Sequence, residues 1–421
     1  MGVELLRPLA SLVLLCGCGD GIDVPADGSS IDPTPGLVRI HVGDGISGAR
    51  VLFQNRDSSL VLATRTGMDG SANAYMSGTG FVTVVLGGEL WTYGGVEPGD
   101  DLRLGAPAST GNAVIDLHVP PDSDAASYWL HTSCSQYQEV TGAEAGGRTT
   151  FLPPCAAGPA DLLLITRELG FSVIAHFTAR LDAELGTEGA PSLIELSGPY
   201  LPPVASRITL DDVPGSIGFL YAHQEVVGSH GPLFDSSAFA QTVIDATSVP
   251  SVTIPMPLVP GTRLVTYLDD VGSFGSNSLL HYIQWVPATA DTRIDLGAAA
   301  LPVIPSPPSW DPIRHAITWS EAPAPLTPEA TIADLRFGTG LVWHVLGPRE
   351  RGQGTALALP VLPEADLDPG AQPVVATRFT TIASTTGFAA YRATLLGWAP
   401  KQRWPIEYGS GRVVYNELVP R

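Results

Sequence analysis

Nine histidines are the side chains of this 421-residue chain best suited to acid–base or metal chemistry. Their spacing matches no recognised motif, because neither a His-Glu-x-x-His sequence nor a His-x-His pair occurs. His223 and His230 flank the short turn Val226–Ser229, and Glu225 is close by in the sequence. Zinc ligands recur at family-specific spacings that this group lacks. A polar turn is therefore the preferred interpretation, and no metal site is predicted.

The motifs of common enzyme active sites are missing from the sequence. There is no Gly-x-Ser-x-Gly nucleophile elbow, no phosphate-binding loop and no dinucleotide fingerprint. No catalytic residue and no cofactor is predicted. A site assembled from distant residues stays open as an alternative, since such sites are defined by geometry and not by sequence order.

Acidic residues cluster at several predicted turns. Calcium takes six to eight oxygen ligands, which loops of β-sandwiches can supply, but none of these clusters matches a dedicated calcium loop. Ordinary turn chemistry is the preferred interpretation, and a calcium site is the alternative. The clusters are Asp100-Asp101, Asp211-Asp212, Asp269-Asp270, and Glu364 with Asp366 and Asp368.

Tryptophans offer a second route to ligand binding, because exposed indole rings can stack on sugars. Trp319 and Trp343 lie in predicted strands, where tryptophan usually fills a core. Trp310 and Trp404 lie beside prolines and are the better surface candidates.

Cys18 has the most specific chemical context in the chain. It ends the sequence Leu15-Cys16-Gly17-Cys18, which follows the apolar run Leu9–Leu15. This pattern resembles the lipobox of bacterial lipoproteins. The resemblance implies that residues 1–17 are a cleaved signal peptide and that the sulfur and amine of Cys18 carry acyl chains such as palmitate.

An acylated Cys18 implies a membrane anchor, since two or more acyl chains hold a protein stably on a bilayer. The apolar run is itself far shorter than the roughly 20 residues of a membrane-spanning helix. Gly19 does not resemble an inner-membrane retention signal, so the expected location is the outer membrane of the cell envelope.

With Cys18 acylated, Cys134 and Cys155 would remain as a pair. An even pair in an exported protein predicts a disulfide, with two unpaired buried thiols as the alternative. A loop of this size would contribute about 3 kcal/mol through chain entropy.

The composition favours β-structure and excludes one class of partner. The formal charge of −20 argues against nucleic acid, because phosphate binding needs clustered cations. The 46 glycines and 38 prolines punctuate short apolar runs, which predicts many short strands. The length of 421 residues predicts two to four domains.

Residues 18–35 are rich in Asp, Gly, Ser and Pro and are predicted to be a flexible tether. Residues 36–105 then alternate as short strands. Their Gly48-Ala49 step, the turn at Asp69-Gly70 and the strand after Phe81 resemble the carboxypeptidase regulatory-like, or prealbumin-like, domain. That resemblance implies a non-catalytic seven-stranded β-sandwich.

The rest of the chain is also predicted to be all-β. In residues 106–305 a motif of strand, proline, turn and strand recurs at uneven spacing. Several β-sandwiches in series explain it best, and a β-propeller-like repeat domain is the alternative. Phe171–Leu181 alternates with period two and is predicted to be a strand. After the proline-rich linker 302–312, residues 313–421 are predicted to form a fibronectin- or immunoglobulin-like sandwich, with one of its strands at Ala389–Leu396.

These features predict a non-catalytic cell-envelope lipoprotein that binds or scaffolds, with a carbohydrate or a protein as its ligand. Two alternatives stay open. One is a hydrolase of polymers with sandwiches as accessory modules, and the other is a carbohydrate- or calcium-binding adhesin.

Overall fold

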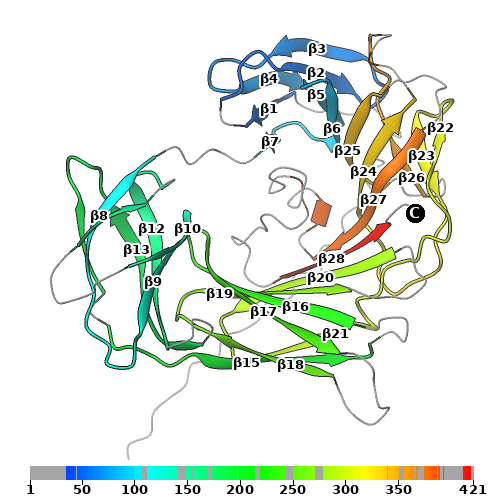
Figure 1. Ribbon diagram of the computed structural model, residues 1–421. Coiled ribbons are helices and arrows are strands. Elements are labelled where there is room, and N and C mark those ends of the chain that lie inside the picture. The colour runs from blue at the N-terminus through cyan, green and yellow to red at the C-terminus, as the bar shows by residue number, and fades with distance from the viewer. Residues whose placement is uncertain are drawn as a thin grey trace, which may run out of the picture. The chain divides into compact units, whose positions relative to one another are not determined.

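The chain is all-β, as predicted, and its strands form several β-sandwiches in series (Figure 1). The computed structural model describes residues 35–43, 45–105, 111–140, 148–152, 155–168, 173–196, 198–213, 219–241, 250–270, 278–338, 340–349, 355–364, 367, 374–385, 387–388, 392 and 411–418. Cys18 and nearly all of the predicted tether lie outside these residues. Within them, no helix has the length and apolar character needed to cross a membrane.

The first sandwich packs a three-stranded sheet, in the order β4-β1-β7, against the four strands β3-β2-β5-β6. Strand β1 is antiparallel to β4 and parallel to β7. Val38, Ile40 and Val42 of β1 are fully buried, while Arg39 between them is exposed, so the period-two pattern of the sequence is realised. The strands are β1 (Gly36–Val42), β2 (Arg50–Asn55), β3 (Leu60–Arg65), β4 (Ser71–Met76), β5 (Gly80–Leu86), β6 (Glu89–Val96) and β7 (Asp101–Leu104).

The second sandwich repeats this topology strand for strand. Its sheets have the orders β11-β8-β14 and β10-β9-β12-β13, and β8 is again antiparallel to one neighbour and parallel to the other. The strands are β8 (Ala113–His118), β9 (Ser127–Thr132), β10 (Ser135–Glu139), β11 (Arg148–Leu152), β12 (Gly158–Arg167), β13 (Ile174–Leu185) and β14 (Ser192–Glu195).

Strand β13 contains most of the segment predicted as a strand from its period-two alternation. Period-two alternation would place Val173 on the buried face with Phe177, but Val173 is 55% exposed and Ile174 is buried instead. The cause is a register shift against β12 between Thr166 and Arg167.

The third sandwich has the same topology, with sheets β18-β15-β21 and β17-β16-β19-β20. The described residues of the predicted middle region therefore form two sandwiches in series and not a propeller. The strands are β15 (Val204–Asp211), β16 (Phe219–Val227), β17 (Pro232–Gln241), β18 (Ser251–Met256), β19 (Arg263–Asp270), β20 (Ser278–Pro287) and β21 (Asp291–Asp295).

The fourth sandwich varies the pattern at one position. Its sheets are β22-β23-β26 and β28-β27-β24-β25, and β22, which precedes the central strand β23, replaces the parallel last strand of the other three. The predicted strand Ala389–Leu396 lies outside the described residues, except for Arg392. The strands are β22 (Ser309–Asp311), β23 (Ala316–Trp319), β24 (Ala330–Phe337), β25 (Val342–Pro348), β26 (Thr355–Ala358), β27 (Val374–Ser384) and β28 (Gly411–Leu418).

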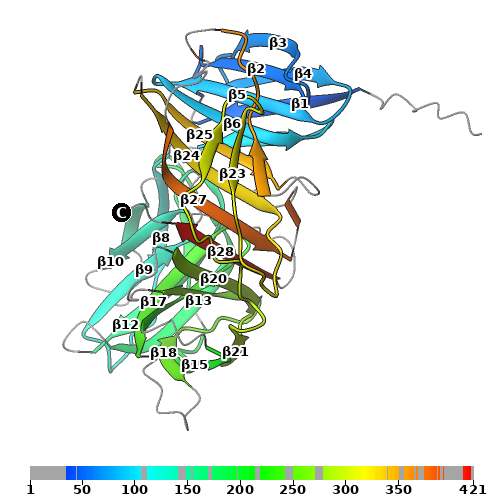
Figure 2. The ribbon, with the colours of Figure 1, turned by 90° about the vertical axis from the view of Figure 1, so that its right-hand side faces the viewer.

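Three of the four sandwiches share one twelve-stranded sheet, in the order β17-β16-β19-β20-β28-β27-β24-β25-β6-β5-β2-β3. Strand β20 pairs antiparallel with β28, which joins the third sandwich to the fourth. Strand β25 pairs in parallel with β6, which joins the fourth to the first (Figure 2). The sandwiches are thus connected by main-chain hydrogen bonds as well as by the chain itself.

The second sandwich meets the third through side chains. In β12, Leu162 and Leu164 face the core of their own sandwich, while Leu163 and Ile165 join the core cluster of the third. Both faces of β12 are covered, which explains its continuous apolar sequence.

Candidate functional site

The junction between the second and third sandwiches centres on Asp161, a carboxylate with no exposed surface. Its Oδ1 accepts a hydrogen bond from the backbone N–H of Asp182 at 3.0 Å. Its Oδ2 accepts one from the backbone N–H of His230, in the third sandwich, at 2.9 Å. A buried charge is tolerated only when such donors replace water. Asp161 therefore holds the β16–β17 hairpin of the third sandwich against strand β12 of the second.

Local backbone geometry makes this approach possible. Asp182 adopts a positive φ of 52°, beside a register shift between β12 and β13 at Ala160 and Leu162. Across the junction, a Cβ atom on Gly228 would lie 2.1 Å from Asp161 Oδ2, so only glycine fits there. Gly228 begins the β16–β17 hairpin without a positive φ, so this position needs glycine for the close approach to the carboxylate and not for the turn itself.

The same junction gathers a group of potential metal ligands. His230 Nε2 lies 2.7 Å from Asp182 Oδ1, and both side chains reach solvent. One ligand atom from each of Asp161, Asp182 and His230 lies within 4.8 Å of the others. Two carboxylates and an imidazole suit a transition metal better than calcium. In the structure hydrogen bonds already satisfy these atoms, and the group acts as a link between sandwiches.

A second group lies inside the second sandwich. Asp122 Oδ2 is 2.9 Å from His176 Nδ1 and accepts a hydrogen bond from Thr166 Oγ1 at 2.8 Å. Burial alone would raise the pKa of Asp122, but the hydrogen bonds from His176 and Thr166 outweigh it and hold the pKa below its ordinary value. Asp124 completes this group. The threonine contacts the carboxylate and not the imidazole, so the arrangement is no nucleophile–base–acid triad.

The junction between the first and fourth sandwiches has its own polar contacts. The rings of Trp91 and His344 stack at 3.8 Å between centroids. His344 Nδ1 lies 2.8 Å from Asp334 Oδ1, and its Nε2 lies 3.3 Å from Glu89 Oε2. Arg378 reaches the other oxygen of Asp334 at 3.1 Å. These contacts lie where β6 pairs with β25, so they reinforce the shared sheet.

His131 is buried at the junction of the second and third sandwiches. Its ring lies edge-on to Phe234, 5.4 Å away, and 6% of the residue is exposed. Burial, with a smaller contribution from the nearby Arg167, lowers the pKa of His131 to about 4. The imidazole is therefore neutral at pH 7.

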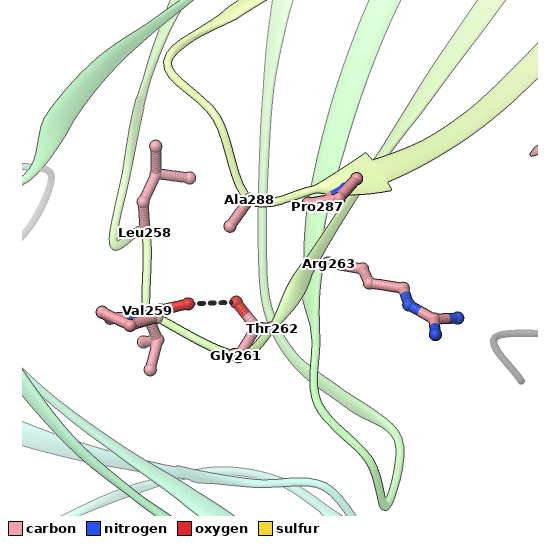
Figure 3. A pocket seen from close by; sticks show the side chains of 8 residues that line it. Leu258, Val259, Gly261, Thr262, Arg263, Pro287 and Ala288 are labelled. Atoms are coloured by element: carbon pink, nitrogen blue, oxygen red, sulfur yellow. Dashed lines mark hydrogen bonds between the residues drawn. The ribbon is translucent and has the colours of Figure 1, made fainter. Parts of the chain in front are cut away.

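Two hollows among the described residues are large enough to hold a small ligand. One of about 500 Å³ lies in the third sandwich, where Thr262 Oγ1 donates a hydrogen bond to the carbonyl of Val259 at 2.6 Å (Figure 3). Its lining is mainly apolar, and Arg263 extends away from the Val259–Thr262 turn. The other, of about 640 Å³, is lined by residues of the first and fourth sandwiches, including Arg56, Glu97 and His315.

Cys134 and Cys155 form a disulfide, as the sequence predicted, with their Cα atoms 5.2 Å apart. The bond lies in the second sandwich, where Thr132 Oγ1 is 3.5 Å from Cys155 Sγ. Both cysteines border the core of this sandwich. Cys18 is outside the described residues, so its acylation stays a prediction.

The other sequence candidates have structural roles. His223 packs on Tyr267, with ring centroids 5.2 Å apart, and does not join His230. Trp310 packs edge-on against Phe337 at 6.1 Å, and Trp404 lies outside the described residues. Acidic residues from the predicted turns contact arginine or histidine side chains, and Asp366 and Asp368 lie outside the described residues. The pairs are Asp100–Arg392, Asp101–His41, Asp211–Arg293, Asp269–His281 and Glu364–Arg50.

Sequence reasoning missed the partners of His230, which come from another sandwich. One signal was present, because Asp161 directly precedes the apolar run Leu162–Ile165. A carboxylate next to such a run is expected to be buried, and a buried carboxylate needs donors.

No protein-family model matches the chain, and no curated protein is significantly similar to it. Among solved structures, the Bacillus anthracis TIE protein is 14% identical over 62% of this chain and 49% of its own, with a TM-score of 0.15. A tetra-tandem repeat from the extending region of a large adhesion protein is 12% identical over 83% and 95%, with a TM-score of 0.12. A candidate adhesin from Bacteroides ovatus is 9% identical over 58% and 75%, with a TM-score of 0.13. TM-scores this low place no constraint on function.

Proposed function

We propose that this chain is a cell-envelope lipoprotein in which four β-sandwiches form a binding or scaffolding module anchored through acylated Cys18. The observation that carries the scaffolding part is the way the sandwiches are joined. Strand pairs β20–β28 and β6–β25 connect three of them within one sheet, and Asp161 links the second to the third.

These junctions support a scaffold because they fix neighbouring sandwiches to one another. Domains joined only by a flexible linker move independently by default. Paired main chains and a buried, hydrogen-bonded carboxylate instead resist separation, since opening either leaves polar groups without partners. A module of this kind can hold its loops at set spacings from the cell surface.

The anchor is supported by the sequence Leu15-Cys16-Gly17-Cys18 and by the polar stretch that follows it. Two or more acyl chains on Cys18 would hold the protein stably on a bilayer. The polar residues 19–35 would then separate the sandwiches from the membrane surface. We place the anchor in the outer membrane, where the protein would bind a carbohydrate or protein ligand.

Metabolic labelling with a clickable fatty acid tests the anchor, because only an acylated protein acquires the label. The wild-type chain should be labelled and should sediment with outer membranes. Cys18→Ala should lose the label and the membrane association. Cys16→Ala is the matched control, since it removes a thiol two positions earlier and should leave labelling intact. Label that persists in Cys18→Ala would refute the anchor.

A further inference from the structure

Strand β3 forms one end of the twelve-stranded sheet and, within the described residues, pairs only with β2. Leu60, Val61 and Leu62 are 46%, 36% and 40% exposed. Successive side chains of a strand point to opposite faces, so β3 presents apolar surface on both sides as well as an open main-chain edge.

This edge lacks the features that usually protect an edge strand. From Leu60 to Thr64 it carries no charge and no proline. Several other edge strands in the described part of the chain are protected in the expected ways, because charged side chains and proline oppose the addition of another strand. The protecting residues are Asp101 and Arg103 in β7, Glu195 in β14, Pro255 in β18, and Asp291, Arg293 and Asp295 in β21.

The equivalent edge of the fourth sandwich is occupied in this structure. Strand β25 holds the same place in its sandwich as β3 does in the first, and it pairs with β6 from Val342–Glu89 to Leu346–Tyr93. The fold therefore already uses this edge position to join one sandwich to another. At the far end of the twelve-stranded sheet the equivalent strand, β17, lies against β9 and β12 of the second sandwich.

Charge favours an identical partner at this edge. The chain has a formal charge of −20, which opposes self-association over most of its surface. The stretch Ser58–Met68, which contains β3, has no carboxylate and one arginine, Arg65. Two copies that meet along this stretch therefore bring none of its own carboxylates against each other.

The main chain of β3 also directs some of its N–H groups outward, where a further strand could accept their hydrogen bonds. The N–H of Thr66 donates to the carbonyl of Ala49 at 2.8 Å, so it points toward β2. Donors alternate along a strand, and the N–H groups of Ala63 and Arg65 consequently point away from β2. They are available to a strand added outside β3.

We infer that β3 is a dimerisation edge, at which β3 of one copy pairs antiparallel with β3 of a second copy about a two-fold axis. A register centred near Leu62 brings the apolar residues of the two strands together and keeps the two Arg65 side chains apart. The two sheets then continue as one. Because the same surface is used by both copies, the contact closes as a dimer and does not propagate.

Analytical ultracentrifugation of the full chain tests this inference. The Cys18→Ala form is used so that acylation plays no part, and the result is therefore independent of the anchor. We expect a monomer–dimer equilibrium below about 100 µM. Leu62→Lys should weaken dimerisation at least about tenfold by placing like charges opposite each other. Ala63→Pro should do the same by removing an outward donor.

The matched control is Leu193→Lys, because Leu193 is 57% exposed on another edge strand, β14, and should leave the dimer intact. Far-UV circular dichroism confirms that the variants are folded. Hydrogen exchange of wild-type protein gives a readout without substitution, since the amides of Ala63 and Arg65 should become protected as concentration rises. A monomer throughout this range, or a dimer that Leu62→Lys and Ala63→Pro leave unchanged, would overturn the inference.

Discussion

The carboxylate of Asp161 accepts a hydrogen bond from the backbone N–H of His230, 69 residues away and in the next sandwich. Gly228 lies against the same carboxylate, so the hairpin that carries His230 approaches as closely as a main chain can. This contact and the surrounding apolar residues make the second and third sandwiches depend on each other.

Asp161→Asn should destabilise this junction by about 2–4 kcal/mol, because an amide nitrogen would face one of the backbone donors and the charge that strengthens both bonds would be lost. Urea unfolding monitors the effect, together with hydrogen exchange at the amides of Asp182 and His230. Asp182→Asn is the control: its side chain is 71% exposed, and it should cost less than about 1 kcal/mol. Equal effects of the two variants would contradict the role given to Asp161.

Gly228→Ala should destabilise the same junction by about 1–3 kcal/mol, since the new methyl group would overlap Asp161 Oδ2 and push the hairpin away. Gly189→Ala is the matched control, because no atom lies within 4 Å of the position that its new methyl group would take, and its effect should stay within about 0.5 kcal/mol. Thermal unfolding of the two variants side by side gives the comparison. A harmless Gly228→Ala would mean that the hairpin is not held at this distance in solution.

Protonation of His131 should weaken the fold in mild acid. Its folded-state pKa of about 4 is below the ordinary 6.5, so the unfolded chain binds the proton first as pH falls. The stability that neutral His131 preserves is fully present above pH 6.5 and is lost between about pH 6.5 and pH 4. A difference of this size corresponds to at most about 3 kcal/mol.

Unfolding free energies of wild type and His131→Gln at pH 7.5 and pH 4.5, conditions spanning about three pH units, isolate this effect. Groups other than His131 titrate in both proteins, so their contribution cancels in the difference. The wild type should lose more stability on acidification than the variant. Equal losses of unfolding free energy in the two proteins would show that folding does not lower the pKa of His131.

Removing the disulfide should cost the second sandwich about 3 kcal/mol, the chain-entropy value for a loop of this length. The bond closes a separation of 21 residues between Cys134 and Cys155. The test is a urea titration of wild type and of the double variant Cys134→Ser, Cys155→Ser, each with and without reductant. Reductant should shift the wild-type midpoint toward the variant and leave the variant unmoved. A wild-type midpoint that ignores reductant would count against a stabilising bond.

The strands and the disulfide were predictable because their signals are local. Alternation along Gly36–Val42 marks one face of β1, and Cys134 and Cys155 emerge as a pair by elimination. The fourfold repeat was harder to recognise, since loops of different length place the equivalent central strands at uneven intervals. These strands begin at Gly36, Ala113, Val204 and Ala316.

The junctions were not predictable from local pattern. The β6–β25 strand pairing is made by main-chain groups, which every sequence carries, and the side chains that meet across it, such as Trp91 and His344, form no recognisable motif. Asp161 gave a partial signal through its apolar neighbours, but its donors are backbone N–H groups of distant residues. A sequence read in order cannot identify a partner defined only by proximity in space.

The pairing of β6 with β25 and of β20 with β28 imposes an order on biosynthesis. A ribosome delivers β6 more than half a chain before β25, and it delivers β20 well before β28. Nascent protein thus displays two unsatisfied strand edges while the last sandwich is still missing, and such edges readily recruit the wrong strand. Folding of this polypeptide therefore requires that the early sandwiches avoid pairing with other strands until their late-made neighbours arrive.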